Sequence, residues 1–160
     1  MELSDVNKIL DIYHSNDYSQ NFEYYDLHWK KNRWLRISNY KEFNFVKEAI
    51  NTDIHKINPK YEIGDFITLL VYERGDFFGK HIDGPSYITT KKKTVLTGGY
   101  LLNNNYTGGE FIVENKELQV QLGELFVFGR EDYHEVKKVI SGIRYSLHFA
   151  INVDNDKVLI

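Results

Sequence analysis

Two segments in the first third of the chain repeat their hydrophobic residues at helical spacing. Between residues 3 and 14, apolar side chains recur every three or four positions (Leu3, Val6, Ile9, Leu10 and Tyr13). A second set with the same period lies between residues 40 and 58 (Phe43, Val46, Ile50, Ile54 and Ile57). An apolar stripe at this period is typical of an amphipathic helix on a core. The pattern predicts two helices, with Ser4 as the N-cap of the first and Pro59 closing the second.

After Pro59 the hydrophobic period changes to two. The segments that alternate in this way, or form short apolar runs, are 65–73, 94–102, 110–114, 117–122, 124–128, 135–140 and 143–151. Glycine or charged turns separate them, as at Gly108, Gly123 and Gly142. Short strands divided by such turns are typical of a sandwich or barrel. The sequence therefore predicts a mainly β fold with N-terminal helices that buttress one face of the sheet.

The segment between the two predicted helices, residues 15–39, is polar and aromatic. Trp29 and Trp34 flank a basic group formed by Lys30, Lys31 and Arg33. Aromatic residues interleaved with basic ones can bind nucleic acid. The same composition also suits a loop or short strand whose aromatic side chains pack on the core, and we favour that interpretation.

Composition narrows the classes of function. The chain has 160 residues, of which 42% are hydrophobic, enough for one folded domain spanning residues 1–160. Its net charge of −3, with both signs interspersed, disfavours nucleic acid and anionic membranes as partners. The absence of cysteine excludes thiolate metal sites. No apolar run approaches the ~18 residues of a membrane span, and the first residues lack the apolar stretch of a signal peptide, so we expect a soluble, cytoplasmic or otherwise intracellular protein.

His81 and Asp83 are the first candidates for chemistry. They lie two residues apart, so on an extended segment both side chains leave the same face and can share one cation. The remaining histidines are possible third ligands (His14, His28, His55, His134 and His148). His134 is the best of them, because an apolar strand and a short charged loop deliver it. Two histidines and one carboxylate on one side of a cation form the facial triad of non-haem Fe(II) oxygenases.

Arg144 and Ser146 share one face of the apolar strand 143–151. An arginine in such a strand is costly to bury without an anionic partner. No partner is evident on the same strand, so the carboxylate of a ligand is an attractive one, held in a bidentate grip. His148 lies on the same face and is interpreted as a core residue.

The ordered set of these residues resembles the Fe(II)/2-oxoglutarate oxygenases, and among them the prolyl 4-hydroxylase-like branch. The residues that carry the resemblance are Tyr72, Gly75, Phe78, His81 and Asp83, then Gly108, Gly109 and Glu110, then Gly123, His134, Arg144 and Ser146. The resemblance implies a double-stranded β-helix (jelly-roll, cupin-like) core over residues 61–153. Residues 1–60 would then be a helical support region.

The resemblance also implies roles for individual residues. His81, Asp83 and His134 would ligate Fe(II), and Arg144, assisted by Ser146, would grip the distal carboxylate of 2-oxoglutarate. Tyr72 and Tyr100 would serve the cosubstrate as well. Many prolyl hydroxylases have lysine where this chain has Arg144, which loosens the assignment of the substrate. The segment from Gly84 to Lys93, with Gly84, Pro85, Ser86 and Tyr87 at its start, is a possible substrate lid.

The activity implied is hydroxylation of a C–H bond, with dioxygen as second cosubstrate, ascorbate as reductant, and succinate and carbon dioxide as products. A protein or peptide substrate with a peptidyl proline is favoured. Another protein side chain, a free amino acid or a small metabolite is the alternative substrate. A non-catalytic metal-binding cupin-like barrel is the alternative from a different class, and a nucleic-acid demethylase is the least favoured. Neither the oligomeric state nor the hydroxylated atom follows from the sequence.

Overall fold

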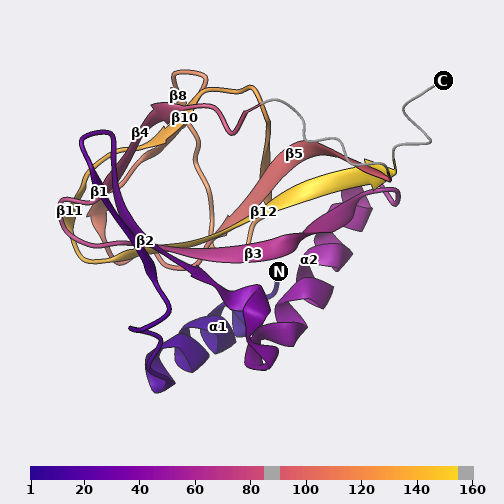
Figure 1. Cartoon of the computed structure of the whole chain (residues 1–160), viewed down its shortest axis with the longest axis horizontal. Helices are drawn as coiled ribbons and strands as arrows, with labels where there is room; N and C mark the ends of the chain where they lie inside the picture. The colour runs from indigo at the N-terminus through magenta and orange to yellow at the C-terminus, as the bar shows by residue number, and fades with distance from the viewer. Residues whose placement is uncertain (85–90, 155–160) are drawn as a thin grey trace.

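The helical and alternating periods of the chain reappear as helices and strands in the computed structural model, which describes residues 1–84 and 91–154 (Figure 1). The helices are α1 (Leu3–Ser15), η1 (Ile37–Asn39), η2 (Lys41–Phe43) and α2 (Asn44–Ile57), of which η1 and η2 are single 3-10 turns. The strands are β1 (Glu23–Leu27), β2 (Lys30–Arg36), β3 (Glu62–Tyr72), β4 (Phe77–His81), β5 (Lys92–Leu101), β6 (Thr107–Gly108), β7 (Phe111–Val113), β8 (Lys116–Glu117), β9 (Phe126–Gly129), β10 (His134–Val136), β11 (Val139–Ser141) and β12 (Arg144–Asp154). No helix of the described residues is long and apolar enough to cross a membrane.

The main sheet is antiparallel and curls around a central hollow. Its strand order is β8-β7-β10-β4-β2-β3-β12-β5-β9, with β1 paired to β2 and with β6 and β11 forming a separate pair. In this order β2, β3 and β12 lie between β4 and β5. Nevertheless Asp83, just after β4, accepts a hydrogen bond from Thr97 of β5. That bond can form only because the sheet curls far enough to bring its two halves face to face, as Figure 1 shows.

The alternation along β12 separates the core from the hollow. Its odd-numbered residues Tyr145, Leu147, Phe149 and Ile151 are buried in the cluster beneath the helices. Its even-numbered residues Arg144, Ser146 and His148 face the opposite side, in register with Tyr72, Leu70 and Thr68 of β3. Successive side chains of a strand point to opposite faces, so one strand supplies both a core and a polar interior.

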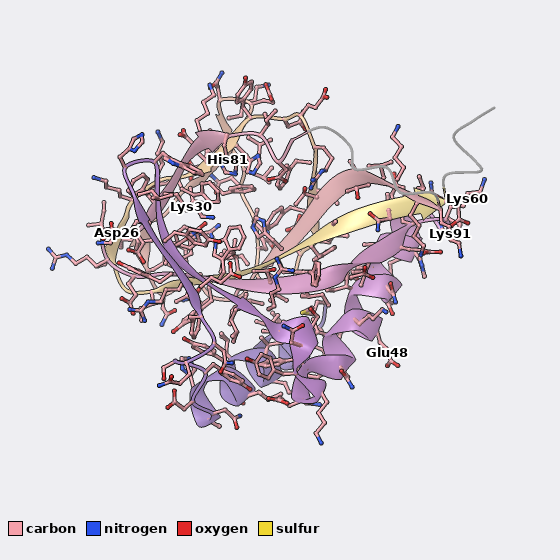
Figure 2. The ribbon with its side chains drawn as sticks, in the orientation of Figure 1. Asp26, Lys30, Glu48, Lys60, His81 and Lys91 are labelled. Atoms are coloured by element: carbon pink, nitrogen blue, oxygen red, sulfur yellow. The ribbon has the colours of Figure 1, made fainter. Side chains whose placement is uncertain are left out.

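The helices α1 and α2 cover the convex side of β3, β12 and β5 (Figure 1). Val6 and Ile9 of α1 and Ile50 and Ile54 of α2 are at most 1% exposed. Burying each such side chain contributes about 1.5–3 kcal/mol, so the amphipathic stripes fix the helices to the sheet. Figure 2 shows Glu48 projecting outward from this layer, whereas His81 and Lys30 lie around the curl on the other side of the sheet.

The predicted fold class, mainly β with N-terminal helices, is confirmed. The first helix extends over residues 3–15, but its N-cap is Glu2 rather than Ser4, and no side chain caps it. The second predicted helix, 40–58, begins with the single 3-10 turn η2 and becomes α-helical at Asn44. The predicted strand 117–122 is wrong for most of its length, because only Lys116–Glu117 pair as β8.

Residues 1–60, predicted as a helical support region with a loop or short strand between the helices, also contribute two strands to the sheet. Residues 23–36 form the hairpin β1–β2, and β2 lies inside the sheet between β4 and β3. The hydrophobic pattern conceals this strand because its inward-facing residues Lys30 and Asn32 are polar, although both are at most 4% exposed. The strand β4 carries a short aromatic run, Phe77-Phe78, and the sequence pattern did not predict it either.

Candidate metal centre and active-site cavity

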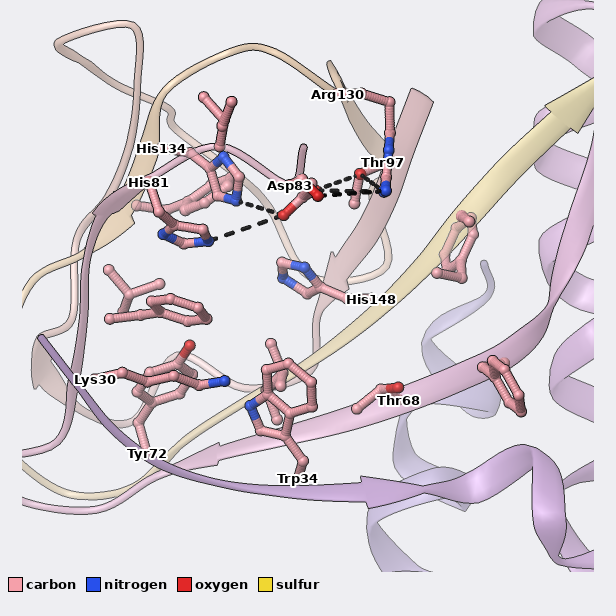
Figure 3. A pocket seen from close by; sticks show the side chains of 18 of the residues that line it. Lys30, Trp34, Thr68, Tyr72, His81, Asp83, Thr97, Arg130, His134 and His148 are labelled. Carbon is pink, nitrogen blue, oxygen red and sulfur yellow. Dashed lines mark hydrogen bonds and ion pairs between the residues drawn. The ribbon is translucent and has the colours of Figure 1, made fainter. Parts of the chain in front are cut away.

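Three side chains at the ends of two adjacent strands converge on one point (Figure 3). His81 ends β4, Asp83 follows it, and His134 begins β10 directly opposite His81 in the β4–β10 pairing. His134 Nε2 lies 3.2 Å and His81 Nε2 3.8 Å from Asp83 Oδ1. Ligand atoms of all three residues lie within 4.8 Å of one another. The structure thus brings together the three residues that the sequence predicts as metal ligands.

Backbone carbonyls orient both imidazole rings. Nδ1 of His81 lies 2.7 Å from the Gly79 carbonyl oxygen, and Nδ1 of His134 lies 3.0 Å from that of Asp132. A carbonyl oxygen only accepts hydrogen bonds, so each Nδ1 must carry the hydrogen. In the neutral imidazole this leaves the lone pair on Nε2, the atom that faces Asp83. Metal-ligating histidines commonly donate their other ring N–H in this way.

Asp83 is held from the other side of the hollow. Its Oδ2 accepts a hydrogen bond of 2.5 Å from the Thr97 hydroxyl, and the Arg130 guanidinium lies 3.9 Å from the same oxygen. Burial alone would raise the pKa of the carboxyl group, but the hydrogen bond from Thr97, joined by one from His134 whenever Nε2 of that ring is protonated, outweighs burial and holds the pKa of Asp83 well below its usual range. Asp83 is therefore a carboxylate with Oδ1 turned towards the histidines.

The three converging groups are all electron-pair donors, so they repel one another unless a proton or a cation lies between them. Burial lowers the pKa of His81, which disfavours a proton on that ring. Two nitrogen ligands and one carboxylate oxygen on one side of a cation suit Fe(II) and leave coordination positions open. The residues present thus fit a divalent metal ion of this kind.

Aromatic rings enclose the candidate metal centre. Phe78 stacks on His81 with ring centroids 3.7 Å apart, and the ring of Phe128 lies 4.4 Å from that of His134. An apolar surround of this kind lowers the local dielectric and restricts the rotation of both imidazoles. The two ligands are therefore held before any metal binds.

A cavity of about 530 Å³ opens beside the three ligands and is lined largely by apolar and aromatic side chains. Such a volume is in the range of small-molecule sites. Polar atoms of Trp34, Tyr72 and His148 on its wall are buried and have no hydrogen-bond partner within the described chain. Because unsatisfied buried polar groups are costly, they indicate a cavity built to receive polar groups of a ligand.

Arg144 and Ser146 of β12 form a group with Tyr72 of β3, which lies directly opposite Arg144 in the strand pairing. Arg144 is 3% exposed, its Nη1 donates to the Ser146 hydroxyl at 3.1 Å, and its guanidinium lies 5.5 Å from the centre of the Tyr72 ring. Burial raises the pKa of Tyr72 to about 12. Among the described residues, no carboxylate lies within 4 Å of Arg144. Tyr72 and Phe111 line the main cavity, whereas Arg144 borders a smaller one of about 140 Å³ that also touches Phe111.

The placement of Tyr100 contradicts the prediction that it serves the cosubstrate. Tyr100 lies opposite Leu147 on β12 and points into the core beneath the helices, where its hydroxyl donates to Asp53 of α2 at 2.7 Å. The residue of β5 that reaches the cavity is Thr97, three positions earlier and therefore on the other face of the strand.

The other predicted residues divide between the surface and the cavity. His14, His28 and His55 are exposed, as expected for ordinary surface histidines. His148, interpreted as a core residue, instead lines the cavity. Of the possible lid, Gly84 is described and has a φ of +103°, whereas Pro85, Ser86 and Tyr87 lie outside the described residues.

Sequence reasoning did not assign several residues of the cavity wall to the site, among them Lys30, Thr97, Arg130 and His148. A period of two in the segment Lys30-Lys31-Asn32-Arg33-Trp34 was the available signal for Lys30, because it puts Lys30 and Trp34 on one face. No pattern in the neighbouring sequence indicates that Thr97 or Arg130 belongs to the site, since their contacts with Asp83 depend on the curl of the sheet.

A curled antiparallel sheet with a His-Asp-His centre at one end of its hollow defines a class of metal-dependent β-barrel proteins. A profile of the 2OG-Fe(II) oxygenase superfamily matches residues 67–152, more than half of the chain. The protein therefore belongs to that superfamily, as its resemblance in sequence predicts.

Individual similar proteins agree with this assignment. A PKHD-type hydroxylase of Prochlorococcus marinus (strain MIT 9312) is 31% identical over 71 residues, which are 42% of this chain and 32% of the relative. The match thus spans about a third of the relative's length. Among solved structures, a Pseudomonas putida prolyl-4-hydroxylase superposes with a TM-score of 0.72 at 15% identity, covering 94% of this chain and 87% of that one. HygX from Streptomyces hygroscopicus, solved with nickel and 2-oxoglutarate, gives a TM-score of 0.68 at 9% identity, covering 94% and 79%. These similarities confirm the double-stranded β-helix fold.

Proposed function

We propose that this protein is an Fe(II)- and 2-oxoglutarate-dependent dioxygenase that hydroxylates a C–H bond of its substrate. The observation that carries the proposal is the convergence of His81 Nε2, His134 Nε2 and Asp83 Oδ1 beside a largely apolar cavity. Membership of the 2OG-Fe(II) oxygenase superfamily supports the same chemistry.

In this proposal each group of residues has one task. His81, Asp83 and His134 hold the iron, while Thr97 keeps Asp83 in the rotamer that presents Oδ1. Arg144 binds the distal carboxylate of 2-oxoglutarate, which satisfies its unpartnered Nε. Ser146 orients the guanidinium, and Tyr72 offers its free hydroxyl to the same cosubstrate.

When bound, iron and 2-oxoglutarate supply the oxidation: dioxygen converts 2-oxoglutarate to succinate and carbon dioxide and delivers one oxygen atom to a substrate C–H bond. The chain itself needs no acid or base for this. Its part is to orient the reactants and to exclude water, for which the apolar wall formed by Leu70, Phe78, Phe111 and Val136 is suited.

A peptidyl proline is the proposed substrate. The similar proteins include prolyl hydroxylases by name, and the apolar cavity is compatible with a pyrrolidine ring. Since fold alone does not fix the substrate, another protein side chain, a free amino acid or a small metabolite is the second candidate. This second candidate is favoured by Lys30, a cation in the cavity wall to which the proposal assigns no contact with 2-oxoglutarate.

The test is reconstitution of the purified chain with Fe(II), ascorbate, 2-oxoglutarate and dioxygen. Succinate should form slowly without substrate and faster with a peptide from a proline-containing library whose mass rises by one oxygen atom. His134→Ala should abolish both signals, whereas His28→Ala, which alters an exposed histidine, should leave them unchanged. Equal, background-level succinate in the wild type and in His134→Ala would favour a non-catalytic metal-binding barrel instead.

A further inference from the structure

Lys30 is a buried cation in the wall of the active-site cavity. It lies on β2, faces inward, and is only 4% exposed. None of the described residues accepts a hydrogen bond from its ammonium group or offers it a carboxylate within 4 Å. An ammonium group has three N–H donors, and burying them without acceptors is costly. The burial of Lys30 therefore needs a compensating interaction.

Aromatic rings offset part of that cost. The ammonium nitrogen lies 3.5 Å from the centre of the Trp34 ring, 3.8 Å from that of Tyr25 and 4.6 Å from that of Phe78. Cation–π contacts stabilise the positive charge but do not satisfy its hydrogen-bond donors. Burial lowers the pKa of Lys30 to about 8, so the amine remains mostly protonated at neutral pH. A cation with free donors thus persists inside the cavity.

The ammonium group is close to the candidate metal centre. Phe78 stacks face to face on His81, and Lys30 lies over the ring of Phe78 as well. Since His81 covers one face of that ring, Lys30 occupies the other. Only the thickness of one phenyl ring therefore separates the lysine from a metal-binding imidazole.

Trp34 adds a second free donor at the same place. Its indole Nε1 is buried without a hydrogen-bond partner, and its ring touches the Lys30 ammonium. Figure 3 shows the indole nitrogen on the side of the ring that faces the lysine. Two adjacent donors, one of them charged, match a carboxylate, which has two acceptor oxygens and a negative charge.

The other cations of the site already have tasks. Arg130 lies against Asp83 and Thr97, and Arg144 is assigned to the distal carboxylate of 2-oxoglutarate. Lys30 lies on β2, whereas Arg144 lies on β12 and Arg130 follows β9. Lys30 borders the main cavity, where the substrate must enter to reach the metal. We therefore expect the anion that binds to Lys30 to come from a molecule other than 2-oxoglutarate.

We propose that Lys30 and Trp34 form a carboxylate-binding subsite that holds a carboxylate of the substrate beside the metal centre. That a substrate occupies this subsite rests on the proposed function. The subsite favours a molecule with a carboxylate near the reacting C–H bond, such as a free amino acid or a peptide that ends in proline. A proline inside an uncharged peptide does not use it.

The test compares matched probes that differ only in the carboxylate: acetate with acetamide, L-proline with L-prolinamide, and Gly-Pro with its C-terminal amide. Each is titrated by calorimetry into the full chain, with and without Mn(II) and 2-oxoglutarate. The variants are Lys30→Met, which keeps the bulk and removes the charge, and Trp34→Phe, which keeps a ring and removes the N–H. Lys31→Met is the control, because Lys31 is adjacent on the opposite face of β2.

The wild type and Lys31→Met should bind at least one carboxylate probe tenfold or more tightly than its amide. Lys30→Met should abolish that preference, and Trp34→Phe should reduce it. If no pair shows a preference, or if Lys30→Met retains it, the subsite does not exist. Thermal unfolding of each variant shows whether a loss of binding is a loss of fold.

Two further measurements separate the sources of the carboxylate and the two proposals. A tenfold loss of 2-oxoglutarate affinity in Mn(II)-loaded Lys30→Met, with no carboxylate preference among the probes, would assign the subsite to the cosubstrate and overturn its assignment to the substrate. Succinate release by the wild type with Fe(II) tests the proposed function on its own. If no succinate is released but the carboxylate preference is kept, the carboxylate-binding subsite is supported and the proposed oxygenase activity is not.

Discussion

Thr97 donates a 2.5 Å hydrogen bond to the carboxylate oxygen of Asp83 that faces away from the two histidines. The contact joins β5 to the residue after β4 across the hollow of the sheet, and it leaves Asp83 Oδ1 as the oxygen available to a metal. Partners that orient a metal ligand in this way commonly govern metal affinity.

Replacing Thr97 should therefore weaken metal binding without changing any ligand. Thr97→Val keeps the shape of the side chain but removes the hydroxyl, and the affinity for Mn(II) should fall about 10–100-fold. Titration of the metal-free protein with Mn(II) measures it. Thr94→Val is the matched control, since Thr94 is also buried on β5 but donates to Asn152 at 2.8 Å. Equal affinities for the two variants would show that Asp83 needs no orienting partner.

Arg144 should govern binding of the cosubstrate and not of the metal. Arg144→Met should weaken 2-oxoglutarate binding to the Mn(II)-loaded protein by about 2–5 kcal/mol, because a buried carboxylate would lose its charged partner. Its affinity for Mn(II) should stay close to that of the wild type. Calorimetry separates the two affinities, with Arg33→Met, which alters a half-exposed arginine paired to Glu73, as control. Parallel loss of both affinities would mean that Arg144 only supports the fold.

Two buried tyrosines should respond in opposite ways to the loss of their hydroxyl groups. Tyr100→Phe removes the donor to Asp53, so the free energy of unfolding should fall by about 1–2 kcal/mol while 2-oxoglutarate affinity is kept. Tyr72→Phe removes a hydroxyl that has no partner among the described residues, so stability should change little while 2-oxoglutarate affinity falls. Urea unfolding and calorimetry on both variants provide the comparison. A loss of 2-oxoglutarate affinity in Tyr100→Phe would show that Tyr100 does contribute to cosubstrate binding.

Acid should destabilise the metal-free protein through His148. Burial lowers the pKa of His148 to about 3, whereas an unfolded histidine has a pKa of about 6.5. Between these values the unfolded state binds a proton that the folded state does not, so the free energy of unfolding falls as pH falls. The slope from this residue approaches about 1.4 kcal/mol per pH unit.

The measurement is urea unfolding of the metal-free chain at a series of pH values between 3 and 7. His148→Gln should have a shallower acid limb than the wild type, because its side chain does not titrate. His28→Gln, which alters an exposed histidine, should follow the wild-type curve. Superimposable curves for all three would show that His148 titrates alike in the folded and unfolded chain.

The sequence by itself determined the elements whose signal is local. The periods of three to four residues before Pro59 predicted the two helices, and the period of two predicted most of the strands. The order of His81, Asp83, His134 and Arg144 carried the resemblance from which the proposed metal ligands and the proposed cation for the cosubstrate were predicted. These inferences required no knowledge of which strands pair.

Only the tertiary structure decided which residues meet across the sheet. A strand shows alternate residues on opposite faces, and the pairing of β5 with β12 determines that Thr97 reaches the cavity while Tyr100 points into the core. Lys30 was concealed for a related reason, since an inward-facing lysine breaks the apolar alternation that identifies a buried strand. Register and curl are long-range properties, so no single segment of the sequence contains them.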